Sequence, residues 1–202
     1  MSRFPQSKSS VEMARPIFSL VQAVRPGKAL VQAPTFAEYA QALAAVGCSV
    51  AYYDSSRQGF HIGRDYLDRL ENSLDMAFLC NPNNPTGFLI EPGTLSQIVE
   101  ICRDKGIMLV VDECFLDFVS DGEKYTLKSR LEECPHLFLL KAFTKRYAMA
   151  GLRLGYGLCA DSTLLGKMSQ VTQPWNVSVP AQAAGVAALA QSAYVREGRR
   201  VV

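Results

Sequence analysis

The 202-residue sequence lacks several features that mark common classes of protein. Its formal net charge is only +2, which argues against nucleic acid or a membrane surface as the main partner. No apolar run approaches the ~18 residues that a membrane-spanning helix needs. The first ten residues, MSRFPQSKSS, contain no apolar signal core, so we expect a cytoplasmic protein rather than a secreted one.

The cysteines and histidines also lack the spacing of metal sites. The six cysteines include no C-x-x-C pair, and several lie in apolar runs. We therefore expect reduced, buried cysteines rather than a disulfide or zinc framework. The two histidines, His61 and His136, are far apart in the sequence and have no ligand-like neighbours, so no metal site is predicted.

Short apolar runs alternate with helical patterns along the chain. The expected strands are 29–33, 49–53, 76–80, 107–111, 137–140 and 154–159. The first three expected helices are 17–24, 36–45 and 63–70. A fourth begins with a Thr94–Gln97 capping box and ends at 105, and a fifth is capped by Asp161 or Ser162 and ends at about 171. One further helix is expected from the Ser178 cap towards the C-terminus. This alternation predicts a layered α/β fold with a mainly parallel sheet.

Polar residues follow three of these expected strands. Asn84 lies in the loop NPNNPTG after the third, Asp112 directly follows the fourth and Lys145 follows the fifth. Ligands of parallel sheets bind beyond the carboxyl ends of the strands, so these residues are expected to converge. Arg153 lies in a Gly-x-Arg-x-Gly-Tyr string and is costly to bury unless an anion meets it. A reactive lysine near a phosphate-binding arginine suits a pyridoxal phosphate site.

Each of these features alone has an ordinary structural explanation. The loop NPNNPTG could be a turn, Asp112 could cap the next segment, and Lys145 could be a surface lysine. Their joint order, however, resembles the fold-type I pyridoxal phosphate enzymes, aminotransferase class I/II, from Ile17 to the C-terminus.

The resemblance implies a three-layer αβα sandwich, the large domain of pyridoxal phosphate-dependent transferases. Residues 1–16 are then an irregular or degraded N-terminal segment, and residues 17–202 form the cofactor-binding large domain. That domain is expected to be incomplete, because the small C-terminal domain of the family is absent. Full-length members are expected to be homodimers.

The resemblance also implies a role for each site residue. Lys145 forms the Schiff base with pyridoxal 5'-phosphate, and Asp112 lies against the pyridine nitrogen. Asn84 donates to the phenolic oxygen of the ring. Arg153 and Thr144 hold the phosphate, for which a guanidinium fork is well suited.

Two aromatic positions narrow the resemblance. Phe115, three residues after Asp112, stands where many aminotransferases have tyrosine, and Phe36 is the aromatic expected to stack on the ring. Together with FAEY, AFTKRYAMAGLRLGY and QPWNVSVPAQAAG, they resemble the threonine-phosphate decarboxylases of cobalamin biosynthesis. The related histidinol-phosphate aminotransferases are the alternative. Either implies a small phosphorylated amino acid or amine as substrate.

The chain departs from the family pattern in two places. The stretch from Lys8 to Pro16 lacks the Asn-Gly-x-x-Glu turn whose amides cup the phosphate, and Ala142 stands where a hydroxyl often helps. A non-catalytic, truncated large domain therefore remains an alternative from another class. A dinucleotide-binding domain is poorly supported, because no Gly-x-Gly-x-x-Gly follows the first strand. The sequence leaves decarboxylation and transamination open.

Overall fold

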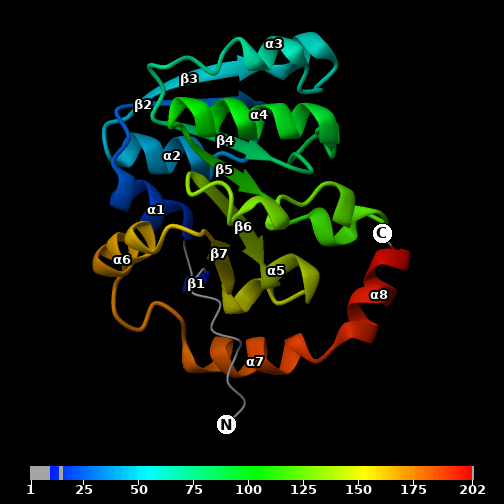
Figure 1. The fold of residues 1–202 in the computed structure, drawn as a ribbon. Coiled ribbons are helices and arrows are strands. Elements are labelled where there is room, and N and C mark those ends of the chain that lie inside the picture. The colour runs from blue at the N-terminus through cyan, green and yellow to red at the C-terminus, as the bar shows by residue number, and fades with distance from the viewer. Residues whose placement is uncertain (1–9, 14–15, 202) are drawn as a thin grey trace.

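The centre of the molecule is a seven-stranded sheet in the order β1-β7-β6-β5-β4-β2-β3 (Figure 1). The computed structural model describes residues 10–13 and 16–201. The strands are β1 (Ser10–Met13), β2 (Lys28–Ala33), β3 (Ser49–Asp54), β4 (Met76–Cys80), β5 (Met108–Asp112), β6 (Leu137–Ala142) and β7 (Gly155–Leu158). The five strands β2 to β6 are parallel to one another. Strand β7 runs antiparallel to both of its neighbours, β1 and β6. The predicted mainly parallel sheet is confirmed.

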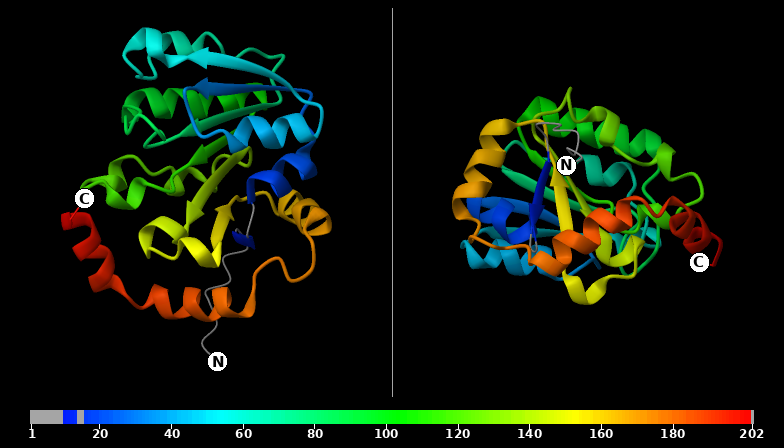
Figure 2. Two further views of the ribbon diagram at one scale, coloured as in Figure 1. Left: turned by 180° about the vertical axis from the view of Figure 1, so that it is seen from behind. Right: turned by 90° about the horizontal axis from the view of Figure 1, so that it is seen from below.

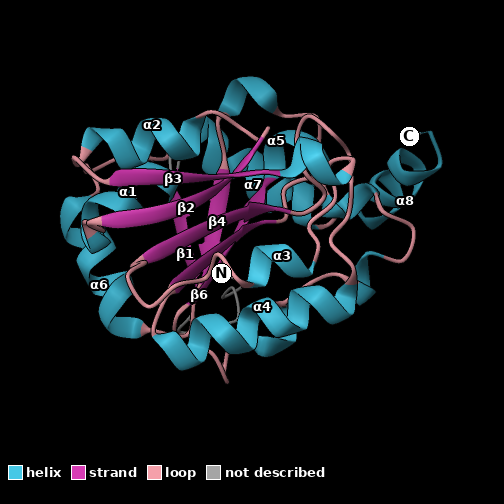
Figure 3. Ribbon diagram, turned by 90° about the horizontal axis from the view of Figure 1, so that it is seen from above, coloured by secondary structure: helices cyan, strands magenta, loops and turns pink. Residues whose placement is uncertain are grey.

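Helices cover both faces of the sheet, which confirms the three-layer sandwich (Figure 3). Helices α1, α2 and α6 pack on one face, and α3 and α4 pack on the other. Helix α7 contributes to a third core cluster with α5. The helices are α1 (Pro16–Val24), α2 (Glu38–Ala45), α3 (Arg64–Leu67), α4 (Pro92–Lys105), α5 (Phe143–Arg146), α6 (Ser162–Val171), α7 (Val179–Leu189) and α8 (Ser192–Val201). Among the described residues, no helix has the length and apolar character to cross a lipid bilayer.

Strand β5 shows how the sheet positions its polar end. All five of its residues are buried, as expected for a central parallel strand with helices on both faces. Side chains alternate between faces, so Val110 packs with α1 and α2, and Val111 packs with α4. The same alternation puts Asp112 on the α2 face and sends Glu113 to the opposite face.

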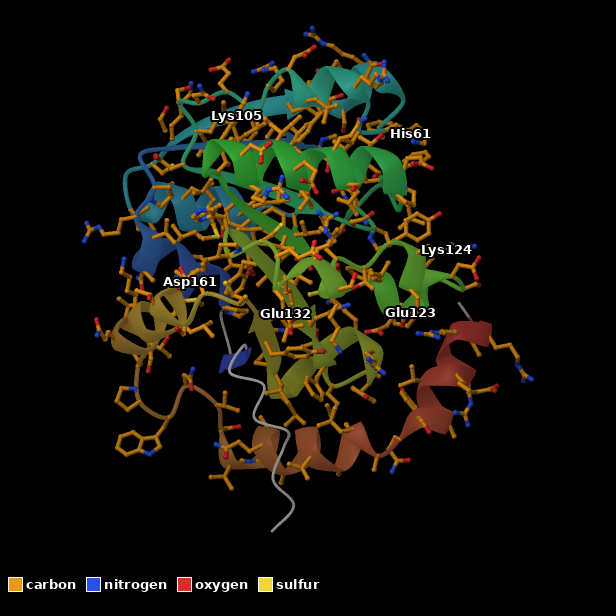
Figure 4. The ribbon with its side chains drawn as sticks, in the orientation of Figure 1. His61, Lys105, Glu123, Lys124, Glu132 and Asp161 are labelled. Carbon is orange, nitrogen blue, oxygen red and sulfur yellow. The ribbon has the colours of Figure 1, made fainter. Side chains whose placement is uncertain are left out.

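Two helix starts test the capping expectations. Asp161 caps α6, accepting from the backbone N–H groups of Thr163 and Leu164, and stands at the start of that helix in Figure 4. The prediction of a Thr94–Gln97 capping box is wrong, because α4 begins earlier, at Pro92. There the Glu91 side chain accepts from the N–H of Gly93 at 2.7 Å, and Pro92 suits the first turn because it has no N–H to satisfy.

Two other expectations differ from the structure. The helix expected at 63–70 is a single turn, α3. The one helix expected after Ser178 is two, α7 and α8, which run in different directions (Figure 2). The break follows from Ala190 and Gln191, whose N–H groups donate three residues back and so tighten and end the helix. The irregular segment expected over residues 1–16 lies largely outside the described residues; within it, Ser10–Met13 form β1.

Candidate active site

A cavity of about 600 Å³ lies at the carboxyl ends of the parallel strands. All seven residues that the sequence singled out contribute to its walls. They come from five places in the chain: the loop before α2, the loop after β4, the end of β5 with the turn that follows it, helix α5 directly after β6, and the turn before β7. These residues are Phe36, Asn84, Asp112, Phe115, Thr144, Lys145 and Arg153. The fold therefore brings together positions that are more than 100 residues apart.

Asp112 is held rigidly at the end of β5. It is only 7% exposed, and each carboxylate oxygen accepts a hydrogen bond. Oδ1 accepts from the backbone N–H of Cys114 at 2.9 Å, and Oδ2 accepts from the hydroxyl of Tyr39 at 2.7 Å. Burial, and then the negative charge of Asp112, raise the pKa of the Tyr39 hydroxyl well above its usual value. Tyr39 therefore keeps its proton and acts as the donor.

Sequence reasoning missed Tyr39, which is fully buried and also lines the cavity. Its ring stacks on Phe78 with centroids 5.0 Å apart, and Phe36 meets it edge-on at 5.6 Å. These two contacts fix the direction of the hydroxyl. One signal could have revealed it: Tyr39 follows Phe36 by three residues, about one helical turn, in PTFAEY.

Asn84 lines the cavity, whereas the two other asparagines of the NPNNPTG loop form hydrogen bonds that hold the loop in place. The side chain of Asn81 accepts from the N–H of Ile90 at 2.9 Å. The side chain of Asn83 donates to the carbonyl of Pro34 at 3.0 Å and accepts from the hydroxyl of Thr35 at 2.8 Å. Asn81 and Asn83 therefore anchor the loop to its surroundings, while Asn84 lines the cavity.

Lys145 and Arg153 line the cavity without a salt bridge to any carboxylate in the described part of the chain. The Nζ of Lys145 lies 5.5 Å from the centroid of the Phe115 ring. By contrast, Lys141 pairs with the fully buried Glu113 at 2.8 Å. A cavity with two unneutralised cations attracts an anionic group.

Arg153 has an uncommon backbone conformation. Its φ of 55° and ψ of 41° are left-handed, at the end of the short 3₁₀ turn η5 (Ala150–Leu152). Such a conformation costs a non-glycine residue energy and persists where its surroundings fix it, often at a ligand site. Its guanidinium Nη1 donates to the carbonyl of Ala150 at 3.3 Å.

The N-terminus of α1 also reaches the cavity, through Pro16, Ile17 and Phe18. The N–H groups of a first helical turn have no partner within the helix and favour anions. In the stretch from Lys8 to Pro16, which lacks the glycine-rich turn of the family, Ser10–Met13 form β1 and Pro16 begins α1, and the other four residues lie outside the described residues.

Comparison with known proteins places the chain in a family. The model of the family "Aminotransferase class I and II" matches residues 13–200. The threonine-phosphate decarboxylase of Salmonella typhimurium is 37% identical over 179 residues, covering 88% of this chain and 49% of that protein. The histidinol-phosphate aminotransferase of a Geobacillus species is 30% identical over 168 residues, covering 83% of this chain and 45% of that protein.

Solved structures agree with these sequence matches. The crystal structure of the histidinol-phosphate aminotransferase from Clostridium acetobutylicum superposes with a TM-score of 0.85 at 25% identity, covering 96% of this chain and 58% of that one. The chain spans about half the length of the curated relatives it matches. It belongs to the aminotransferase class I and II family of pyridoxal phosphate-dependent enzymes.

Proposed function

We propose that this chain forms the cofactor site of an enzyme that acts on a small phosphorylated amino acid or amine. The finer proposal is a threonine-phosphate decarboxylase. The observation that carries it is the single cavity that gathers Asn84, Asp112, Lys145 and Arg153. The finer proposal draws further support from the 37% identity to a threonine-phosphate decarboxylase.

The cavity suits pyridoxal 5'-phosphate in size and charge. Its volume of about 600 Å³ lies in the usual range for small-ligand sites. A buried carboxylate, Asp112, suits the ring nitrogen, which carries a positive charge when protonated. Arg153, a cation without a carboxylate partner in the described part of the chain, suits the anionic phosphate of the cofactor. Lys145, likewise without a salt bridge there, suits the electrophilic aldehyde.

Each residue then has a proposed task. Asp112 binds the ring nitrogen, Asn84 donates to the phenolic oxygen, and Arg153 and Thr144 bind the phosphate. Lys145 holds the cofactor covalently and, once released, moves protons at the substrate α-carbon. The bound cofactor supplies an electron sink for the pair released when a bond to that carbon breaks.

The two aromatic walls favour the decarboxylase over the aminotransferase. Phe36 and Phe115 both line the cavity and present no hydroxyl to the ring. Phenylalanine at both positions resembles the threonine-phosphate decarboxylases, whereas many aminotransferases have tyrosine at the position of Phe115. The histidinol-phosphate aminotransferase remains the second candidate, supported by the 30% identity and by the TM-score of 0.85.

Titration of the purified chain with pyridoxal phosphate tests the cofactor site. We expect a visible absorption band from the lysine-bound cofactor, absent in Lys145→Ala and retained in Lys167→Ala, an exposed lysine on α6. If no band forms at saturating cofactor, the chain does not bind it covalently and a non-catalytic domain is the better account.

Substrate assays on the full-length protein that contains this chain separate the two chemistries. The decarboxylase proposal expects CO₂ from threonine phosphate. Amino transfer from histidinol phosphate to 2-oxoglutarate, without CO₂ release, selects the aminotransferase instead.

We also expect the full-length protein to be a homodimer. In support, Val179, Val186 and Leu189 on α7 are exposed apolar residues, which commonly mark a covered surface. Sedimentation analysis of the full-length protein measures this, and a monomer at assay concentrations would refute it.

A further inference from the structure

The hydroxyl of Tyr39 donates a hydrogen bond to Asp112 in the wall of the cavity. The two side chains are 73 residues apart in sequence, and both are buried. The donor–acceptor distance is 2.7 Å, as in a well-formed O–H···O hydrogen bond. No step proposed above uses Tyr39.

We propose that Tyr39 is a positioning residue that orients the Asp112 carboxylate towards the ring nitrogen of the cofactor. The inference rests on the proposed function, because Asp112 has this task only if the cavity binds pyridoxal phosphate. Tyr39 itself acts through Asp112 and has no direct part in bond breaking.

The two hydrogen bonds of Asp112 explain why the hydroxyl matters. The N–H of Cys114 fixes Oδ1, and the hydroxyl of Tyr39 fixes Oδ2, so the carboxylate plane cannot turn freely. Without the hydroxyl, a buried carboxylate loses one of its two fixed donors.

The surroundings of Tyr39 make it a fixed donor rather than a mobile one. Its ring is held between Phe78, on which it stacks, and Phe36, which meets it edge-on. The backbone of Tyr39 lies in the first turn of α2, which packs against α1 and β3. Substitution by phenylalanine keeps these ring contacts and removes only the oxygen.

The chain offers a matched control. The hydroxyl of Tyr53 also donates to a carboxylate, that of Asp65, at 2.9 Å. Tyr53 belongs to the core cluster on the α4 face of the sheet and does not line the cavity. Tyr53→Phe therefore removes the same kind of hydrogen bond away from the site.

The test measures dissociation constants for two cofactors in each variant. One is pyridoxal phosphate, and the other is its 1-deaza analogue, in which a carbon replaces the ring nitrogen. We expect Tyr39→Phe to weaken pyridoxal phosphate binding by about tenfold, as for loss of one hydrogen bond to a charged group. Binding of the deaza analogue should change less than about twofold, and Tyr53→Phe should leave both constants unchanged.

A double variant adds an independent measurement. In an Asp112→Asn background, adding Tyr39→Phe should cause no further loss of pyridoxal phosphate affinity, because the two residues act as one unit. Equal weakening of both cofactors by Tyr39→Phe, or additive losses in the double variant, would overturn the inference and indicate a general structural role.

Failure of the proposed function gives a different result. In that case the unaltered protein forms no visible band with pyridoxal phosphate, and the inference falls with the function. If the unaltered protein forms the band and Tyr39→Phe binds pyridoxal phosphate equally well, only the inference is overturned.

Discussion

Replacing Gly157 by alanine should lower the free energy of unfolding, because the added methyl group has no room there. Gly157 lies in β7, paired with Leu140 of β6. A Cβ at this position would stand 2.5 Å from Cε1 of Phe138 and closer still to Cζ. Carbon atoms normally approach to about 3.5–4.0 Å, so the ring has to move. Phe138 is fully buried, and its neighbours leave it little room.

The expected cost of Gly157→Ala follows from these contacts. Overpacking of this kind costs typically about 1–3 kcal/mol, and the upper end applies because the contact involves a fully buried ring. Replacing glycine by alanine in a strand recovers roughly 0.5–1 kcal/mol of backbone entropy. The net loss in the free energy of unfolding is therefore about 2 kcal/mol. For a chain of this size it corresponds to a Tm about 4–8 °C lower.

Thermal unfolding followed by circular dichroism measures this loss. Gly166→Ala is the matched control, because its Cβ meets nothing within 4 Å and Gly166 lies inside α6, where alanine is favoured by about 1 kcal/mol. Gly166→Ala should therefore raise the Tm. Combining Gly157→Ala with Phe138→Leu removes the clashing ring and should recover part of the loss. An unchanged Tm in Gly157→Ala would refute the packing argument.

Three further predictions concern charge and protonation. Arg153→Ala should weaken pyridoxal phosphate binding at least tenfold and leave pyridoxal binding nearly unchanged, and equal losses for both would contradict a phosphate contact. Glu113→Gln should lower the free energy of unfolding by about 3 kcal/mol, since it leaves Lys141 without its buried partner; a loss below ~1 kcal/mol in urea unfolding would show that the pair contributes little. Burial raises the pKa of Tyr53 and Tyr156 to about 12 from 10.0. The folded state then holds protons that the unfolded chain releases, so stability should fall as pH rises from about 10 to 12, and a flat Tm over that range would contradict it.

The sequence predicted the converging site because its signals are local. Asn84, Asp112 and Lys145 each follow a short apolar strand, and parallel strands must present their carboxyl ends at one edge. The α/β class followed from the same alternation of strands and helices. The cap at Asp161 was equally local, since a side chain two residues before a backbone N–H is enough to define it.

The missed features depend on contacts between distant residues. The three-residue spacing from Phe36 places Tyr39 near the site, but its hydrogen-bond partner Asp112 is 73 residues away and cannot be identified from the sequence. The same holds for Glu113 and Lys141, whose pairing across β5 and β6 requires the strand register. The break between α7 and α8 has no proline or glycine to mark it, because it arises from the last turn of α7 itself.

The most direct test of the central claim is to identify the residue that carries the cofactor. The protein is loaded with pyridoxal phosphate, reduced with borohydride, digested and mapped by mass spectrometry. The account predicts one stoichiometric adduct, on Lys145 in the α5 turn that lines the cavity. An adduct on another lysine, or adducts spread over several surface lysines, would contradict it.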